Sequence, residues 1–531
     1  MRIQARLTQP TFLTHRREEA SVQKATEETD FLPLRVVSLG DSLTAGSQDA
    51  TTVAERQTMS YMAQLARAVG FPFHPALISD GGIAPRLFQD DTFDYGKAGQ
   101  RSHHIGQAEA PLKKQLANGE IPSDLSSIWS IPGLGARTEE SRDRFLRPQT
   151  NFAVPGYEAR HLAGVRHYEE YLHGMKDGTD ASGLSAEVPL IRAVLQNGGE
   201  RSRGSALDQA IARRPELAVV WAGSNDALET VGAGRIDDRL LTPVEDRPWT
   251  YQVENKSGQL ETRTTNHAVQ GFRTTFLGPA GIVPRLLRET EAEVLLMNIP
   301  DVSNIATLRP LGEKLGDLPF KVTLPDGTDV TEALENWQLP SRVDGEGKDG
   351  RGQFPGGSRV GMNVILNRFI QRGQVQSQSA LEELLKELSA SGFSENEVID
   401  TDELATVSNR ILEFNGILAE SAALDSRVHL LDMNEEFKKI SQGRELSGEG
   451  PSKVLGAHFT GALDKNGVEG IFSYDGVHPS DTGHAVLANA IKEKVGEELG
   501  WHPRFKAFRE RPPIDEKKVL AQDPHHTRSQ S

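Results

Sequence analysis

Four short apolar runs constrain the fold of this 531-residue chain more than any other feature. Each run is rich in aliphatic and β-branched residues and stops at a Gly, Asn or Asp. Runs of this kind are typical of strands buried on both faces of a parallel sheet. We therefore expect strands within residues 34–42, 216–226, 292–301 and 426–434.

Helical periodicity accompanies these runs, in residues 59–70, 280–291, 402–424 and 480–500. Strands that alternate with helices predict an α/β fold with a mainly parallel central sheet and right-handed crossovers. We expect one domain over residues 31–504. Three stretches rich in Gly, Pro and charge interrupt the alternation, and we interpret them as large insertions rather than separate domains: about 71–147, 230–270 and 305–398, the last with a helical segment near 378–391.

The composition, 37% hydrophobic and 25% charged, is that of a soluble globular protein. A formal charge of −16 without a basic patch argues against nucleic acid as a partner. No cysteine is present, which excludes disulfides, thiolate metal sites and a cysteine nucleophile.

Both ends of the chain are polar. Residues 1–30 and the tail 505–531 contain few apolar residues, so we expect both to be frayed or disordered. Neither a secretory signal nor an apolar run long enough for a transmembrane segment is visible. Localisation and oligomeric state are left open.

The first apolar run ends in Gly40-Asp41-Ser42-Leu43. This places Ser42 at a strand-to-helix turn on the carboxyl edge of the sheet, where open α/β folds build their sites. The helix N-terminus behind it would favour a developing negative charge. The same residues also fit a plain helix cap, so Ser42 alone does not establish a nucleophile.

A second motif, Tyr474-Asp475-Gly476-Val477-His478-Pro479, stands before a helical segment. An Asp three residues ahead of a His can fold back to accept from one imidazole nitrogen while the other nitrogen faces a nucleophile. The alternative is a surface turn with a solvated His.

Two further segments offer hydrogen-bond donors. Asn225 follows the strand expected at 216–222, and Gly156 ends the run Asn151-Phe152-Ala153-Val154-Pro155-Gly156. An Asn amide and a Gly backbone N–H can both donate to an oxyanion. Gly99 is an alternative to Gly156 but lacks its spacing from an Asn.

In this order, the segments GDS at 40–42, NFAVPG at 151–156, GSND at 223–226 and DGVHP at 475–479 resemble the four blocks of the SGNH hydrolase superfamily, also called GDSL esterases and lipases. Residues 297–308 and 472–491 are also similar to a branch of larger, often exported bacterial GDSL lipase-like proteins. The interval from Ser42 to Gly156 is longer than in compact members.

The resemblance implies a three-layer α/β/α sandwich of flavodoxin-like type, with the insertions forming a cap. It implies a serine ester hydrolase, an esterase or lipase of lipid metabolism acting on a small-molecule or lipid ester through an acyl-enzyme. Ser42 would be the nucleophile, His478 the base and Asp475 its orienter, with Ser42, Gly156 and Asn225 forming the oxyanion hole. An acyltransferase using the same triad and a non-catalytic binding protein on the same fold are the alternatives.

No cofactor or metal is expected. His103-His104 and His525-His526 lack carboxylates at ligand spacing and are interpreted as solvated loops. The segment 464–467 (DKNG) is similar to the start of a calcium loop but lacks the remaining ligands.

Overall fold

We describe the fold from a computed structural model of the chain. It describes residues 32–80, 88–89, 92–131, 134–139, 148–180, 184–196, 203–254, 260–316, 318–344, 352–371, 375–460 and 468–526. The predicted disordered segment 1–30, the segment 464–467 and the last tail residues 527–531 lie outside the described residues. All elements discussed below belong to the unit Arg35–Ser531.

Four parallel strands form the central sheet, in the order β1 (Val36–Gly40), β6 (Leu217–Trp221), β9 (Glu293–Met297) and β14 (Val428–Leu431). Gly40 pairs with Trp221, Trp221 with Met297, and Met297 with Leu431, so the carboxyl ends of all four strands are level. The four predicted strands and the α/β class with a parallel central sheet are confirmed.

A fifth segment runs parallel to β1 on its other side. Asn151 bridges to Ser38, Phe152 N–H donates to the Ser38 carbonyl at 2.9 Å, and Val154 N–H donates to the Gly40 carbonyl at 3.1 Å. The chain therefore reaches Gly156 at the same edge of the sheet at which β1 delivers Ser42.

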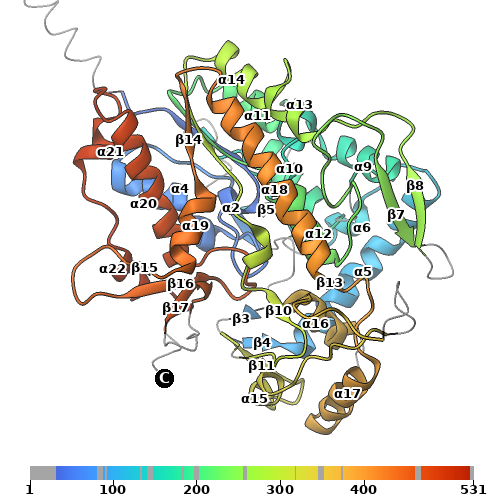
Figure 1. Cartoon of the computed structure of the whole chain (residues 1–531). Helices are drawn as coiled ribbons and strands as arrows, with labels where there is room; N and C mark the ends of the chain where they lie inside the picture. Colours follow the sequence, from blue (N-terminus) through green and yellow to red (C-terminus); the bar gives the residue numbers. More distant parts are fainter. Residues whose placement is uncertain are drawn as a thin grey trace, which may run out of the picture. The chain divides into compact units, whose positions relative to one another are not determined.

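Both faces of the sheet are largely buried, which explains why the strands are predominantly apolar. Val37, Leu39 and their neighbours on one face share a hydrophobic core with α11 (Ala206–Ile211), α13 (Phe272–Leu277) and α18 (Thr401–Ala422). On the other face the Trp221 ring lies 5.7 Å from the Tyr61 ring of α4 (Tyr61–Val69), and α4 packs against α20 (Asp481–Glu498) (Figure 1).

Helices α4, α18 and α20 begin at side-chain caps that the sequence encodes. Ser60 caps α4, Ser480 caps α20, and Asp400 with Glu403 forms a capping box on α18. The predicted helices at 59–70, 402–424 and 480–500 are confirmed, as is the one at 280–291, which is α14 (Ile282–Glu289). Among the described residues, no helix combines the length and apolarity that a membrane crossing requires.

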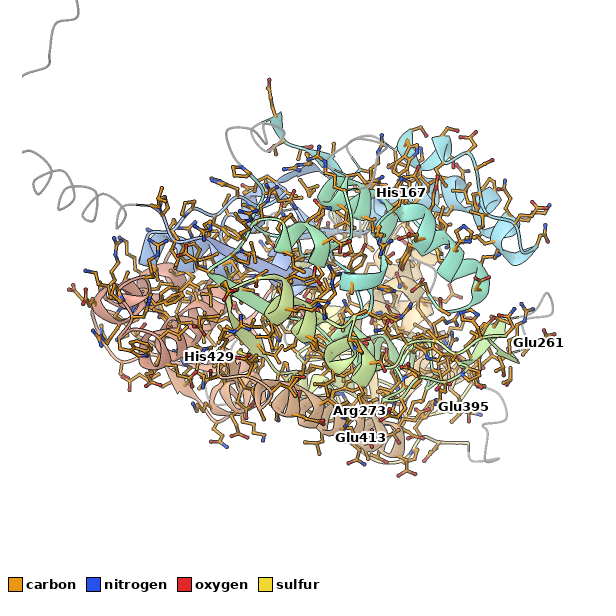
Figure 2. The ribbon with its side chains drawn as sticks, turned by 90° about the horizontal axis from the view of Figure 1, so that it is seen from above. His167, Glu261, Arg273, Glu395, Glu413 and His429 are labelled. Carbon is orange, nitrogen blue, oxygen red and sulfur yellow. The ribbon has the colours of Figure 1, made fainter. Side chains whose placement is uncertain are left out.

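His429, labelled in Figure 2, ties the sheet to α20. Its Nε2 lies 2.9 Å from a carboxylate oxygen of Glu293 on β9, and its Nδ1 lies 2.6 Å from one of Glu498 on α20. Helix α20 is thereby fixed against the edge strand β14.

The third predicted insertion, residues 305–398, contributes most of a second hydrophobic cluster, separate from the core of the central sheet. Phe320, Trp337 and Phe393 form this cluster with Phe93 of the first insertion and with Tyr474. Its described elements are β10 (Leu308–Pro310), β11 (Lys321–Thr323), α15 (Thr331–Glu335), β12 (Arg359–Gly361), α16 (Met362–Gln371), α17 (Gln378–Ser391) and β13 (Val398–Ile399). The helix predicted near 378–391 is therefore confirmed.

The other two insertions also contain regular structure. The second carries an antiparallel pair, β7 (Thr250–Glu254) and β8 (Leu260–Thr264). The first carries the long helix α5 (Tyr95–Ala117), the short helix α6 (Ser126–Trp129) and β4 (Thr92–Asp94), which pairs with β11.

The C-terminal tail is not frayed over its described part, contrary to the prediction. It forms α21 (Lys506–Glu510) and α22 (Glu516–Leu520), and Asp523, His525 and His526 are buried. Its few apolar residues are enough because buried ion pairs supplement them: Arg444 binds Glu516 at 2.7 Å, and His526 binds Glu469 at 2.6 Å.

Candidate active site

Ser42 is the first residue of α2 (Ser42–Ala45), directly after the end of β1. The Asp41 carboxylate caps this short helix by accepting from the Leu43 N–H at 3.0 Å. A Cβ on Gly40 would lie 2.2 Å from the Trp221 carbonyl oxygen, so only glycine fits where β1 and β6 approach at this point. Ser42 is 6% exposed, so it is buried at this turn rather than lying on an open surface.

Asp475 and His478 lie on one tight turn after β17 (Glu469–Phe472). The Ser473 N–H donates to the His478 carbonyl at 2.8 Å, and Gly476 has the left-handed φ of 68° that the turn requires. His478 Nδ1 consequently lies 2.7 Å from Asp475 Oδ2. The other carboxylate oxygen accepts from the N–H groups of Val477 and His478, each at 2.8 Å.

Burial opposes the charged form of both partners, but their mutual attraction outweighs it. The imidazole of His478 and the two N–H donors lower the pKa of Asp475 to about 2. Carboxylates at Asp475, Asp41 and Asp49 hold the pKa of His478 above its ordinary value.

The chain after α2 forms a turn that contacts the His478 loop. Gln48 and Thr51 exchange two backbone hydrogen bonds of 2.9 Å, and the two residues between them, Asp49 and Ala50, both have a φ of 55°. The Ala50 N–H donates to Asp475 Oδ2, the oxygen that also contacts His478.

Two more hydrogen bonds fasten this turn to the loop. The Asp49 N–H donates to Ser473 Oγ at 3.0 Å, and the Tyr474 N–H donates to Asp49 Oδ1 at 3.0 Å. Segments 425 residues apart in the chain are thus joined directly.

Gly156 and Asn225 also meet at this edge of the sheet. Asn225 is the first residue of α12 (Asn225–Ala233), and its side-chain amide donates to the Tyr157 carbonyl at 3.0 Å. The neighbouring Asp226 carboxylate accepts from the Ala159 N–H at 2.8 Å. An amide carries two N–H donors, so Asn225 retains one for another acceptor.

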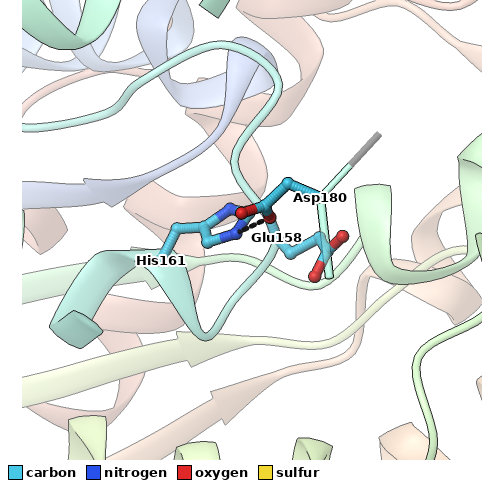
Figure 3. A group of neighbouring side chains, drawn as sticks. All are labelled: Glu158, His161 and Asp180. Atoms are coloured by element: carbon cyan, nitrogen blue, oxygen red, sulfur yellow. Dashed lines mark hydrogen bonds and ion pairs between the residues drawn. The ribbon is translucent and has the colours of Figure 1, made fainter. Parts of the chain in front are cut away.

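A buried group of charged side chains follows Gly156 in the chain and holds this segment in place. Arg160 contacts Glu158 at 2.6 Å and Asp180 at 2.5 Å, and His161 Nε2 lies 2.7 Å from Asp180 (Figure 3). Burial raises the pKa of Glu158 to about 7. For Asp180, Arg160 and His161 outweigh burial and lower the pKa to about 2.

The same group has the donor types of a metal site. One ligand atom each from Glu158, His161 and Asp180 lies within 4.8 Å of the others. The guanidinium of Arg160 already bridges both carboxylates, and it supplies the positive charge that a metal ion would bring. We therefore interpret the group as the support of the Gly156 segment.

The remaining predicted candidates lie elsewhere. Gly99 is inside α5, where its backbone belongs to a helix rather than to the sheet edge. His103 and His104 are exposed as predicted, but on α5 and not in a loop. The prediction that His525 and His526 are solvated is wrong, because both are buried against carboxylates.

Sequence reasoning missed Asp49, Ala50, Arg160 and His525. Asp49 and Ala50 carry no glycine signal for their left-handed backbone, and Arg160 and His525 resemble ordinary surface charges in the sequence. A usable signal for Asp49 was its place seven residues after Ser42, where open α/β folds gather polar groups at the carboxyl edge of the sheet.

Comparison of the chain with protein-family models, with curated proteins and with solved structures gives no match. Support for a function therefore comes from the geometry of the described residues and from the sequence resemblance.

Proposed function

We propose that this chain is a serine ester hydrolase of the SGNH type, with Ser42 as nucleophile, His478 as general base and Asp475 as the residue that orients His478. The oxyanion hole would consist of the backbone N–H groups of Ser42 and Gly156 and the side-chain amide of Asn225. The proposed fold is a three-layer α/β/α sandwich, in agreement with the contacts of different helices on the two faces of the sheet.

The pairing of His478 with Asp475 supports this proposal most strongly. The 2.7 Å contact uses Nδ1, which leaves Nε2 for a nucleophile, and the turn after α2 binds the same Asp475 oxygen. A His held by a carboxylate at one nitrogen can activate a serine hydroxyl with the other, and Ser42 stands at a strand-to-helix turn whose following residues, Asp49 and Ala50, bind the His478 loop.

In the proposed reaction, neutral His478 takes the proton of Ser42 while Ser42 Oγ attacks the ester carbonyl. The negative charge that develops on the carbonyl oxygen is stabilised by the three N–H donors. His478 then protonates the leaving alcohol, and water, activated by the same histidine, hydrolyses the acyl-enzyme. Asp475, with its pKa of about 2, stays ionised throughout and stabilises the imidazolium.

The substrate is proposed to be a small-molecule or lipid ester whose acyl or alcohol part contacts the third insertion. Tyr474, next to Asp475, belongs to the hydrophobic cluster of that insertion, which supports a contact of this kind. Loops at the carboxyl edge of the sheet commonly set substrate choice in α/β enzymes.

Hydrolysis of p-nitrophenyl esters of graded chain length tests the proposal. We expect wild type to be active and Ser42→Ala and His478→Ala to lose activity by about 10⁵-fold, as for other serine triads. Asn225→Ala should lose about a hundredfold. Ser79→Ala and His103→Ala serve as controls, since both side chains are exposed and lie outside the site.

Equal activity of wild type, Ser42→Ala and His478→Ala would contradict the proposal. A competing alcohol in the assay separates hydrolysis from acyl transfer, because a transferase would form a new ester in place of the free acid.

A further inference from the structure

His525, in the C-terminal tail, is fully buried between two carboxylates. Its Nδ1 lies 2.8 Å from Asp523 Oδ1, and its Nε2 lies 2.8 Å from Asp49 Oδ1. Burial opposes a charge on the ring, but the two carboxylates raise the pKa of His525 to about 10. The imidazolium therefore donates a hydrogen bond from each nitrogen at neutral pH, one to Asp523 and one to Asp49.

Both carboxylates that bind His525 are anchored by other elements. Asp523 Oδ2 accepts from the N–H and the hydroxyl of Thr482 in α20, at 2.8 Å and 2.7 Å. Asp49 Oδ1 also accepts from the Tyr474 N–H, and its Oδ2 lies 3.3 Å from Arg56 Nη2. His525 thus connects α20, through Asp523, to the turn that follows Ser42.

The Tyr474 side of this contact is close-packed. The His525 ring lies 4.4 Å from the Tyr474 ring, with an interplanar angle of 67°. Since Asp475 follows Tyr474 directly, the tail touches the loop of the proposed base through both the backbone and a side chain.

The turn at Asp49 and Ala50 requires such support. A φ of 55° at two successive residues with a Cβ is unfavourable and persists only where the surroundings impose it. Its consequence is that the Ala50 N–H points at Asp475 Oδ2. The third backbone donor to the Asp475 carboxylate therefore depends on how Asp49 is held.

We propose that His525 is a positioning residue for the His478–Asp475 pair: by holding Asp49 between the C-terminal tail and the Tyr474 backbone, it fixes the turn whose Ala50 N–H orients Asp475. This inference rests on the proposed function. It makes the C-terminal tail, which is remote from Ser42 in the sequence, a functional part of the site.

The neighbouring histidine separates positioning from simple attachment of the tail. His526 Nδ1 lies 2.6 Å from Glu469 Oε1 on β17 and is buried like His525. It fixes the tail to β17 at a point that does not involve Asp49. Loss of His526 should therefore weaken the fold without releasing the turn.

Two neutral amides in the full-length chain provide the matched test. In His525→Gln the amide nitrogen takes the place of Nε2 and can still donate to Asp49, whereas in His525→Asn it takes the place of Nδ1 and can donate only to Asp523. Both variants lose the positive charge equally. For each we would measure kcat and KM on a p-nitrophenyl ester, the thermal midpoint, and the low-field proton resonance of the His478 Nδ1–H.

We expect His525→Asn to lose kcat by about tenfold or more with KM nearly unchanged, because a small displacement of a catalytic group is costly. Its His478 resonance, identified by its absence in His478→Ala, should shift or disappear. His525→Gln should keep kcat within about threefold of wild type, and so should His526→Gln despite a lower thermal midpoint.

Equal kcat in the His525→Asn and His525→Gln variants, or an unchanged His478 resonance in His525→Asn, would overturn the inference. If wild type shows no Ser42-dependent hydrolysis, the proposed function fails, and the resonance alone then decides whether His525 positions the pair. If His525→Asn does not fold, Asp523→Asn weakens the anchor of His525 on α20 while leaving the contacts of Asp49 with Tyr474 and Arg56 in place, and an unchanged kcat together with an unchanged His478 resonance in that variant would overturn the inference.

Discussion

At the scale of single residues, the charges around His478 determine when it can act as a base. Asp475 faces it from its own loop, Asp41 from the turn before Ser42, and Asp49 from the turn after α2. The fourth group, His484 of α20, is buried, which lowers its pKa to about 3 and keeps it neutral. Burial favours neutral His478, whereas Asp475, Asp41 and Asp49 favour the imidazolium and prevail. Burial raises the pKa of Asp41 itself to about 7, so Asp41 attracts the imidazolium fully only above that pH.

This balance predicts the pH dependence of the reaction. In the proposed reaction His478 has to be neutral to accept the Ser42 proton, so kcat/KM should fall as the pH drops through a pKa that lies above the ordinary value for histidine. Asp41→Asn removes one attracting carboxylate but keeps an oxygen to cap α2. We therefore expect its kcat/KM profile to shift to lower pH.

Asp425→Asn is the control, since Asp425 precedes β14 at the opposite edge of the sheet. Its profile should coincide with that of wild type. A shift of the Asp41→Asn profile to higher pH, or no shift at all, would show that Asp41 does not act on His478.

At the scale of elements, the Gly156 segment has its position because three structures bind it. Strand β1 binds it through backbone hydrogen bonds, and α12 binds it through Asn225 and Asp226. Arg160 holds it by pairing with both Glu158 and Asp180. The side chains of Glu158 and Asp180 are each 3% exposed, so the carboxylates depend on Arg160 for compensation.

Arg160→Leu should accordingly lower the free energy of unfolding by about 3–5 kcal/mol, the usual result when a buried ion pair loses one partner. Without the guanidinium, the folded-state pKa of Asp180 would rise from about 2 to above that of the unfolded chain, and the pKa of Glu158, which burial already raises to about 7, would rise further. The loss should therefore be larger at pH 8 than at pH 5, which urea unfolding at both pH values measures.

Arg288→Leu is the matched control, because Arg288 pairs with Glu289 at an exposed position. It should cost less than about 1 kcal/mol at either pH. Similar losses for the two variants would mean that Arg160 does not compensate the buried carboxylates.

The elements that could be predicted from the sequence are those whose signals are local. Burial on both faces makes β1, β6, β9 and β14 predominantly apolar, and side-chain caps mark where α4, α18 and α20 begin. The segment 150–154 was not predicted as a strand, because it pairs only along β1 and includes polar residues. Local pattern therefore indicated the sheet but not its fifth segment.

The site divides in the same way. Ser42, Gly156, Asn225, Asp475 and His478 stand in short motifs, and the structure brings Asp475 against His478 and Asn225 against the Gly156 segment. The residues that hold them could not be predicted, because their partners are remote. His525 and Asp49, for example, are 476 residues apart in the chain.

At the scale of the whole molecule, the His478 loop contacts two parts of the chain: the third insertion and the C-terminal tail. The sequence alone predicts an insertion for the first and a frayed end for the second. The third insertion contacts it through Thr307, whose N–H donates to the Gly476 carbonyl at 3.0 Å, and through Phe320, whose ring lies 6.0 Å from that of Tyr474. The C-terminal tail contacts it through His525. Both the insertion and the tail therefore contribute to the geometry of the proposed base.

The most direct measurement of the central claim is covalent labelling with a fluorophosphonate, followed by mass spectrometry of the labelled peptide. Such a reagent reacts with a serine activated by a base and an oxyanion hole. We expect one label per chain, on Ser42, and very slow labelling of His478→Ala. Labelling of another serine, or equal labelling of wild type and His478→Ala, would contradict the account.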